Sequence, residues 1–169
     1  MQIRLAGIVT ESVVDGPGVR MVIFVQGCPH GCAGCHNPNT HDPAGGFEKS
    51  VQEIIEMLPK NNLVRGVTFS GGEPFLQPAA LAEIGKEAKS RGFSIVTYTG
   101  YLVEDLLDQS SQNLAISSLL SVTDLLIEGP FLLEQRDIGL GFRGSANQRL
   151  IDVQATIRMG KPIEWMDST

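Results

Sequence analysis

Five short apolar runs of strand length constrain the fold of this chain more than any other feature. They are rich in β-branched residues and lie at residues 21–25, 64–69, 93–97, 124–127 and 149–153. Helical patterns separate most of them. Parallel strands need a long crossover between them, and a helix is the usual crossover. The alternation therefore predicts an α/β fold built on a parallel sheet.

The length of the chain limits how far such a sheet can close. A chain of 169 residues has room for about five βα units, whereas a complete eightfold barrel needs about 250 residues. Hydrophobic residues make up 42% of the chain, which excludes intrinsic disorder. No repeat, low-complexity tract or linker stands out, so residues 1–169 are expected to form a single domain.

Helix boundaries are clearest at two places. Ser50 and Glu53 match a capping box, which predicts the start of a helix that extends to residue 57. A second helix is expected to begin near Pro78 and to stop at Gly92. Residues 102–122 predict either one broken helix or two.

The charge balance excludes several classes of partner. Thirteen basic and nineteen acidic residues give a net charge of -6, which provides no basic patch for nucleic acid or an anionic membrane surface. No apolar run approaches the roughly 18 residues needed to cross a bilayer, and no signal-peptide pattern is found at the N-terminus. We therefore expect a cytoplasmic protein that binds neither nucleic acid nor membrane.

All three cysteines and all three histidines lie within residues 28–41. Cys28, Cys32 and Cys35 belong to the segment CPHGCAGC, which follows the first predicted strand. Cysteines this close in sequence suit a metal better than a disulfide. Zinc, completed by one of the histidines, and an iron–sulfur cluster are both possible occupants. Structural zinc sites usually add a second ligand pair far away in sequence, and this chain has none, which favours the cluster.

The C-x3-C-x2-C spacing resembles the signature of the radical S-adenosylmethionine enzymes. The resemblance implies that the three cysteines hold a [4Fe-4S] cluster, whose open iron chelates S-adenosylmethionine. Reductive cleavage would then release methionine and a 5′-deoxyadenosyl radical, so that no side chain need act as acid or base. It also implies an incomplete parallel β/α barrel of about five to six strands. The histidines are then expected to be loop residues.

Two glycine-containing segments extend this resemblance. The sequence SGGEP resembles the GGE segment of the family, which implies that Gly71, Gly72 and Glu73 bind the methionyl amino group. Before the third cysteine, where the family often has an aromatic residue, this chain has Gly34. The backbone around Gly34 and His36 is therefore expected to contact the adenine.

Other segments narrow the subfamily. DGPGVR at residues 15–20, followed by VIFVQGC, resembles the activating enzymes of glycyl-radical proteins. DLLIEGPF at 124–131 and RGSANQR at 143–149 resemble segments of the activating components of anaerobic ribonucleoside-triphosphate reductases. This implies a large reductase subunit as partner, on which a backbone glycine loses a hydrogen atom, and a flavodoxin-type electron donor.

Three further side chains are candidate ligands. Thr99 and Glu128 each end a predicted strand, and in the related pyruvate formate-lyase activators oxygen ligands at such strand ends bind a monovalent cation near the S-adenosylmethionine carboxylate. We therefore hypothesise a monovalent cation site at Thr99 and Glu128. Arg143 is the candidate for pairing a carboxylate, because its guanidinium can donate two parallel hydrogen bonds.

Two alternative functions stay open from the sequence. One is an activator of another glycyl-radical enzyme, such as the pyruvate formate-lyase type, or a radical enzyme that acts on a small molecule. The other belongs to a different class: a zinc-loop binding module without catalysis. Cluster reconstitution and cleavage of S-adenosylmethionine would distinguish the two classes.

Overall fold

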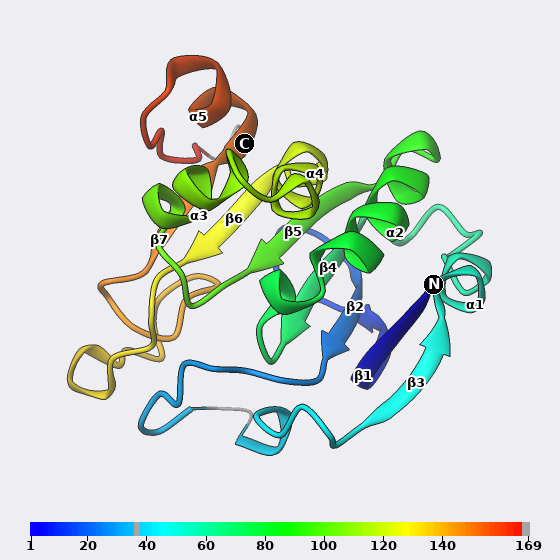
Figure 1. Ribbon diagram of the computed structural model, residues 1–169, viewed down its shortest axis with the longest axis horizontal. Helices are drawn as coiled ribbons and strands as arrows, with labels where there is room; N and C mark the ends of the chain where they lie inside the picture. The colour runs from blue at the N-terminus through cyan, green and yellow to red at the C-terminus, as the bar shows by residue number, and fades with distance from the viewer. Residues whose placement is uncertain (36–37, 167–169) are drawn as a thin grey trace.

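A seven-stranded mixed sheet organises this computed structural model, which describes residues 1–35 and 38–166 (Figure 1). The strand order is β3–β1–β2–β4–β5–β6–β7. Strands β2, β4, β5 and β6 are parallel neighbours, while β1 and β3 at one side and β7 at the other run antiparallel to their neighbours. The strands are β1 (Gln2–Ser12), β2 (Arg20–Val25), β3 (Phe47–Ser50), β4 (Gly66–Gly71), β5 (Ser94–Tyr98), β6 (Leu125–Glu128) and β7 (Arg149–Asp152).

The sheet differs from the sequence prediction in strand number and direction. The sheet has seven strands and not the expected five to six, because no apolar run in the sequence marks β1 or β3. The prediction of an all-parallel sheet is wrong at β7, which pairs antiparallel with β6. The chain between these two strands contains only the short 3-10 helix η3 (Leu133–Gln135), so it returns directly without a helical crossover. Closure of the sheet into a partial barrel stays a prediction.

Five α-helices are found in the described residues: α1 (Val51–Glu56), α2 (Pro78–Ser90), α3 (Val103–Ser110), α4 (Leu114–Val122) and α5 (Val153–Met159). Helices α1, α2, α4 and α3 lie side by side along one face of the sheet (Figure 1). The predicted capping box is confirmed, with Ser50 and Glu53 exchanging hydrogen bonds of 3.0 and 3.1 Å. The ambiguous region forms two helices, because the Asn113 side chain caps the second one.

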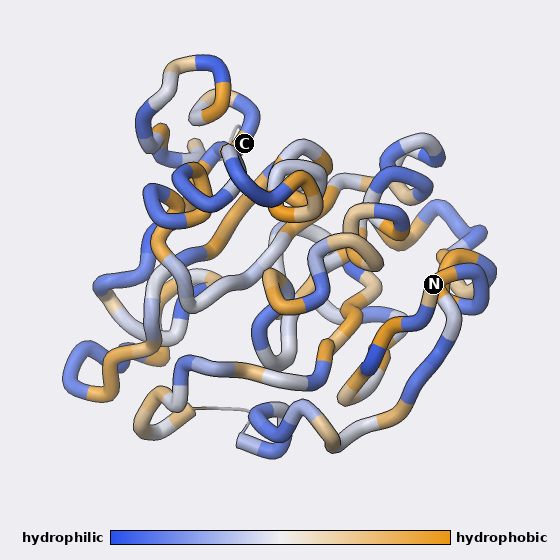
Figure 2. Tube along the Cα trace, in the orientation of Figure 1, coloured by the Kyte–Doolittle hydropathy of each residue, from blue (hydrophilic) through white to orange (hydrophobic). Residues whose placement is uncertain are grey.

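The core lies between this row of helices and the strands. Strand β2 is almost entirely buried and nearly all apolar, as expected for a strand covered on both faces. Figure 2 shows hydrophobic stretches along β2 and β6. Two further 3-10 helices, η1 (Pro38–Thr40) and η2 (Pro74–Leu76), lie in the loops. None of the helices in the described part of the chain is long and apolar enough to cross a membrane.

The carboxyl ends of β2, β4, β5 and β6 lie at one edge of the sheet, as the arrowheads in Figure 1 show. The loops that follow these strands carry the cysteine segment, the SGGEP segment, Thr99 and residues 129–148. The sequence prediction that the chemical motifs gather beyond the strand ends is therefore confirmed. This edge is the usual place for ligand sites in parallel sheets.

Near the opposite edge, a buried arginine joins the strands. The guanidinium of Arg20 donates to the Thr68 hydroxyl at 2.8 Å, to the carbonyl of Ser94 at 2.8 Å and to the carbonyl of Pro17 at 2.9 Å. Burial lowers the pKa of Arg20 to about 10, so the side chain is still charged at neutral pH. A Cβ atom at Gly66 would lie 2.3 Å from the guanidinium, which explains the glycine there.

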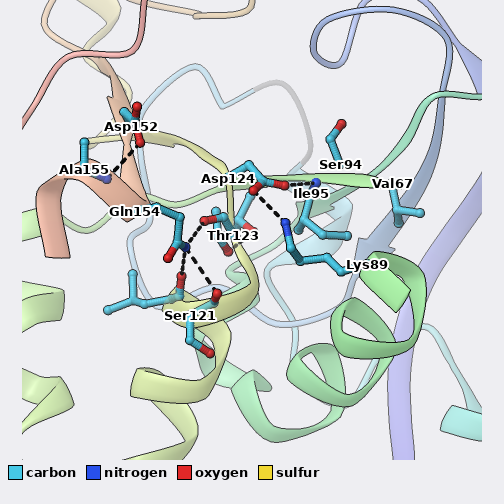
Figure 3. Close-up of polar contacts among 12 residues, drawn as sticks. Val67, Lys89, Ser94, Ile95, Ser121, Thr123, Asp124, Asp152, Gln154 and Ala155 are labelled. Atoms are coloured by element: carbon cyan, nitrogen blue, oxygen red, sulfur yellow. Dashed lines mark hydrogen bonds and ion pairs between the residues drawn. The ribbon is translucent and has the colours of Figure 1, made fainter. Parts of the chain in front are cut away.

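A second polar cluster at this edge connects helices to strands (Figure 3). The carboxylate of Asp124 accepts hydrogen bonds from the Ile95 backbone at 2.8 Å and from the Lys89 ammonium at 2.7 Å. Next to it, the Gln154 side chain donates to the carbonyl of Thr123 at 2.8 Å. These contacts attach α2 to β5, and α2 and α5 to the two residues that precede β6. The edge opposite the chemical motifs is therefore held together by polar contacts.

We predict that Arg20→Met lowers the free energy of unfolding by about 3 kcal/mol or more. The substitution leaves several buried oxygen atoms without their hydrogen-bond donor, and each such atom costs about 1–3 kcal/mol. Urea denaturation followed by circular dichroism measures the change. Arg65→Met, at an exposed neighbouring position, is the control and is expected to stay within about 0.5 kcal/mol. Equal losses in both variants would contradict the role of Arg20.

Candidate functional site

A cavity of about 510 Å³ opens at the carboxyl ends of the parallel strands. Its wall comes from the cysteine loop, the end of β4, the end of β5 and the segment between β6 and β7. The structure thus brings together residues from separate parts of the sequence. The predicted site residues that line it are Cys28, Cys32, Cys35, Gly71, Gly72, Thr99 and Arg143.

The cysteine loop packs directly on the glycines that end β4. The Glu73 backbone N–H donates to the carbonyl of Gly27 at 2.7 Å, and a Cβ atom at Gly72 would lie 2.2 Å from that oxygen. At Gly71 the backbone adopts a φ of 99°, and a Cβ atom would lie 2.5 Å from the Val25 nitrogen. These glycines are required for the loop to sit against the strand ends, and they also line the cavity.

The three cysteines are thiols, not disulfides, and each is partly exposed. Burial raises the pKa of the Cys28 thiol, and the charges of Glu73, Cys32 and Cys35 raise it further. Three thiolates on one loop therefore repel one another. A positively charged iron centre would remove this penalty, because metal coordination favours the deprotonated thiol.

The donor set fits an iron–sulfur cluster. Thiolates are the usual ligands of [4Fe-4S] clusters, and each cysteine binds a different iron, so the sulfur atoms need not surround one ion. Within the described residues, no three histidine, cysteine or acidic side chains form a group that could hold a single metal ion. His30, one of the candidates for completing a zinc site, has a different partner.

That partner is Glu73, whose carboxylate is fully buried. It accepts hydrogen bonds from His30 Nε2 at 2.5 Å, Thr99 Oγ1 at 2.8 Å, the Gly100 backbone at 2.8 Å and the Phe75 backbone at 3.0 Å. The carboxylate faces these donors and does not line the cavity. Glu73 therefore connects the cysteine loop to the ends of β4 and β5. Its expected contact with the methionyl amino group stays a prediction.

His30 is more than the loop residue that the sequence indicated. Its ring packs edge-on against Tyr101, with ring centroids 4.6 Å apart. A Cβ atom at Gly100 would lie 2.5 Å from the same ring, so the ring needs a glycine beneath it. His30 and Glu73 are 43 residues apart, and no local pattern marks the pair.

Glu128, the second residue of the cation hypothesis, has hydrogen-bond partners within the protein. Its buried carboxylate accepts two hydrogen bonds of 2.9 Å from Arg149 and one of 2.7 Å from the Val103 backbone at the start of α3. These bonds, with a further one to Glu104, raise the pKa of Arg149. Thr99 points instead to Glu73. The two predicted ligands thus have different partners, and Arg149 already supplies the positive charge that a cation would bring to Glu128.

Arg143 has an unsatisfied nitrogen in the cavity wall. Its Nη1 donates to the carbonyl of Gln148 at 3.0 Å, while its Nε is buried without a hydrogen-bond partner. Nε2 of His41, another residue of the cavity wall, is also buried and unpaired. Among the described residues the third such atom is Oδ1 of Asn147. Buried polar atoms without partners are rare, and in a cavity wall such an atom is a candidate contact for a polar ligand or a water molecule.

Two further predicted site residues, Gly34 and His36, are the expected adenine contacts. Gly34 has a φ of 72° and packs beside Leu133, where a Cβ atom would lie 2.8 Å from the leucine side chain. It does not line the cavity. His36 lies outside the described residues. The predicted adenine contact at these positions therefore stays a prediction.

Comparisons with known proteins agree with the chemistry of the site. Residues 14–151 match a family model described as a 4Fe-4S single cluster domain. The anaerobic ribonucleoside-triphosphate reductase-activating protein of Vibrio cholerae is 38% identical over 145 residues, which cover 80% of this chain and 89% of that protein. The pyruvate formate-lyase-activating enzyme of Clostridium pasteurianum is 41% identical over 104 residues, which cover 58% of this chain and 44% of that protein. The crystal structure of QueE from Escherichia coli gives a TM-score of 0.47 at 21% identity, covering 59% and 53% of the two chains.

We predict that Glu73→Gln lowers the free energy of unfolding by about 2 kcal/mol and reduces iron incorporation. In either orientation the new NH2 group faces hydrogen-bond donors, and the buried site offers no water to compensate. Urea denaturation and the iron content after anaerobic reconstitution measure the two effects. Glu83→Gln, on the exposed side of α2, is the matched control and should leave both unchanged. Wild-type stability and iron content in Glu73→Gln would contradict the connecting role of this carboxylate.

Proposed function

Because the chain belongs to the family of anaerobic ribonucleoside-triphosphate reductase-activating proteins, we propose that it generates a glycyl radical on the large subunit of such a reductase. It is a radical S-adenosylmethionine enzyme with a [4Fe-4S] cluster. The observation that carries the proposal is that the three cysteines line the same cavity as Gly71 and Gly72. That arrangement provides a cluster site and a ligand site side by side.

Cys28, Cys32 and Cys35 are the residues that would hold the cluster. When bound, the cluster supplies the electron that cleaves S-adenosylmethionine to methionine and a 5′-deoxyadenosyl radical, which abstracts a hydrogen atom. The chain contributes positioning to this chemistry. Glu73 holds the cysteine loop against the ends of β4 and β5, and Gly71 and Gly72 allow a ligand to approach the backbone closely.

Arg143 is proposed to bind the carboxylate of S-adenosylmethionine. The bond from Nη1 to Gln148 fixes the guanidinium while leaving Nε unpaired. Nε and Nη2 form one edge of the guanidinium, and such an edge donates two parallel hydrogen bonds to a carboxylate. Two observations support this assignment: Nε has no hydrogen-bond partner, and Arg143 lines the cavity. The contacts of Glu128 do not favour an additional monovalent cation there.

The open side of the cavity suits a protein substrate. Val14 lines the cavity and yet is 72% exposed, so at this point the cavity wall carries an apolar side chain that is open to solvent. A radical that must reach a backbone glycine on another protein requires such an opening. A loop of the partner inserted there would also exclude water from the reactive centre.

The electron donor and the cellular location complete the proposal. We propose a one-electron donor of the flavodoxin type, in agreement with the family resemblance. The three cysteines are thiols in the structure, and the cytoplasm is the compartment that keeps thiols reduced. We therefore place the reaction in the cytoplasm.

A pyruvate formate-lyase-type activator is the second candidate, because a protein of that name also matches this chain. That match covers only 44% of the relative, whereas the match to the reductase-activating protein covers 89%. The extent of the match therefore favours the reductase as the substrate. The zinc-loop module is not favoured, since most of the chain matches a 4Fe-4S domain family.

We predict that the reconstituted, reduced protein converts an anaerobic reductase subunit to its glycyl-radical form when S-adenosylmethionine is present. Electron paramagnetic resonance detects the radical, and chromatography detects 5′-deoxyadenosine. Cys32→Ala should yield neither product, because one cluster ligand is lost. A radical on pyruvate formate-lyase but not on the reductase would favour the second candidate. Cleavage by Cys32→Ala would contradict the ligand assignment.

We also predict that Arg143→Met weakens binding of S-adenosylmethionine by about 10- to 100-fold, because hydrogen bonds to charged groups contribute about 1.5–3 kcal/mol. Arg143→Lys should have an intermediate effect, since it keeps the charge but loses the fork. Isothermal titration calorimetry on the cluster-loaded protein measures the affinity. Arg136→Met, in the exposed part of the same segment, is the control. Wild-type affinity in Arg143→Met would overturn the assignment.

A further inference from the structure

The second unsatisfied nitrogen of the cavity belongs to His41, which the proposed function does not use. Its Nε2 is buried without a hydrogen-bond partner, although the residue lines the same cavity as the three cysteines. The backbone of His41 is held on both sides. Its N–H donates to the carbonyl of Pro38 at 3.3 Å, and its carbonyl accepts from the Cys28 backbone at 3.2 Å. The unpaired atom therefore belongs to a residue whose backbone is anchored.

His41 lies beside the strand ends that are expected to contact the ligand. The carbonyl of the preceding residue, Thr40, accepts from the Gly27 backbone at 2.6 Å, and a Cβ atom at Gly72 would lie 3.0 Å from that oxygen. The segment that carries His41 is thus packed against the end of β2 and the Gly71–Gly72 pair. A ligand bound against these glycines would therefore also lie next to the segment that carries His41.

Arg143 approaches the cavity from the other side. It belongs to the segment between β6 and β7, whereas His41 is attached to the end of β2, and β4 and β5 lie between them in the sheet. The two unpaired nitrogens therefore belong to segments on different sides of the strand ends, from which they can contact different atoms of one extended ligand. S-adenosylmethionine, with polar groups along its whole length, has the chemistry for both contacts.

The other described histidine of this region, His30, has partners for its ring, whereas His41 has none among the described residues. His30 Nε2 is bonded to Glu73, and its ring packs on Tyr101. His41 Nε2 has no such partner in the described part of the chain, and leaving a buried polar nitrogen unpaired is costly. Binding of a ligand with a polar atom at this point removes that cost.

We propose that His41 Nε2 forms a hydrogen bond with S-adenosylmethionine bound in this cavity, which makes His41 a further binding residue. The inference rests on the proposed function, because it takes S-adenosylmethionine as the ligand. Imidazole Nε2 can donate or accept a hydrogen bond, depending on the tautomer. Glutamine places an amide group near the same position, whereas leucine keeps the bulk without any polar atom.

The test is equilibrium binding of S-adenosylmethionine and S-adenosylhomocysteine to the cluster-loaded protein, measured anaerobically by calorimetry without reductant. His41→Leu is expected to weaken binding of both compounds by about tenfold. His41→Gln is expected to restore most of that loss. Asn39→Ala, at an exposed neighbouring position, is the control and should bind as the wild type does. Iron content is measured for each variant.

Wild-type affinity in His41→Leu would overturn the inference while leaving the proposed function intact. Loss of iron in both His41 variants would also overturn it, since His41 would then support the cluster loop and not the ligand. A wild-type protein that holds its cluster but binds neither compound would instead overturn the proposed function, and the inference with it. The two failures are therefore distinguishable in one experiment.

Discussion

The buried carboxylate of Glu73 is the interaction on which the site depends. A charged group in the interior is costly unless donors surround it. Here the donors come from the cysteine loop through His30, from the end of β5 through Thr99 and Gly100, and from the η2 turn through Phe75. Removing one donor leaves a charge that water cannot reach. The cysteine loop and the strand ends are therefore held in one arrangement.

A second buried charge, that of Arg20, has the corresponding role at the other end of the strands. Its hydrogen bonds reach β4 and β5, the strands whose far ends are joined by Glu73. Strand β4 begins and ends with glycine, Gly66 beneath the guanidinium and Gly71 against β2. The parallel strands that bear the site are thus fixed at both ends by polar contacts, in addition to the apolar core between them.

Polar side chains in the cavity wall and behind it fall into two groups, those with hydrogen-bond partners in the protein and those without, and this difference separates structural from candidate binding residues. Glu73, Glu128 and His30 have protein partners, and we assign them to the framework. Arg143 and His41 retain buried nitrogens without partners, and we assign them to the ligand. Glu128 illustrates the difference. It lies at the end of a parallel strand, where ligands often bind, but Arg149 already pairs with its carboxylate, so Glu128 is a weaker candidate for binding a cation. Residue type and strand position alone do not make this distinction.

Local patterns in the sequence were sufficient to predict the central strands to within about two residues, the capping box at Ser50 and the edge of the sheet at which the cysteine loop and the other motifs meet. These features depend on spacing and periodicity between near neighbours in the chain. The strands β1 and β3 and the direction of β7 escaped prediction, because pairing partners and connection paths are properties of the whole sheet. The partners of Glu73, Glu128 and Arg20 were decided only by the tertiary structure. Each of these contacts joins segments far apart in sequence, and which donor meets which carboxylate follows from the order of the strands.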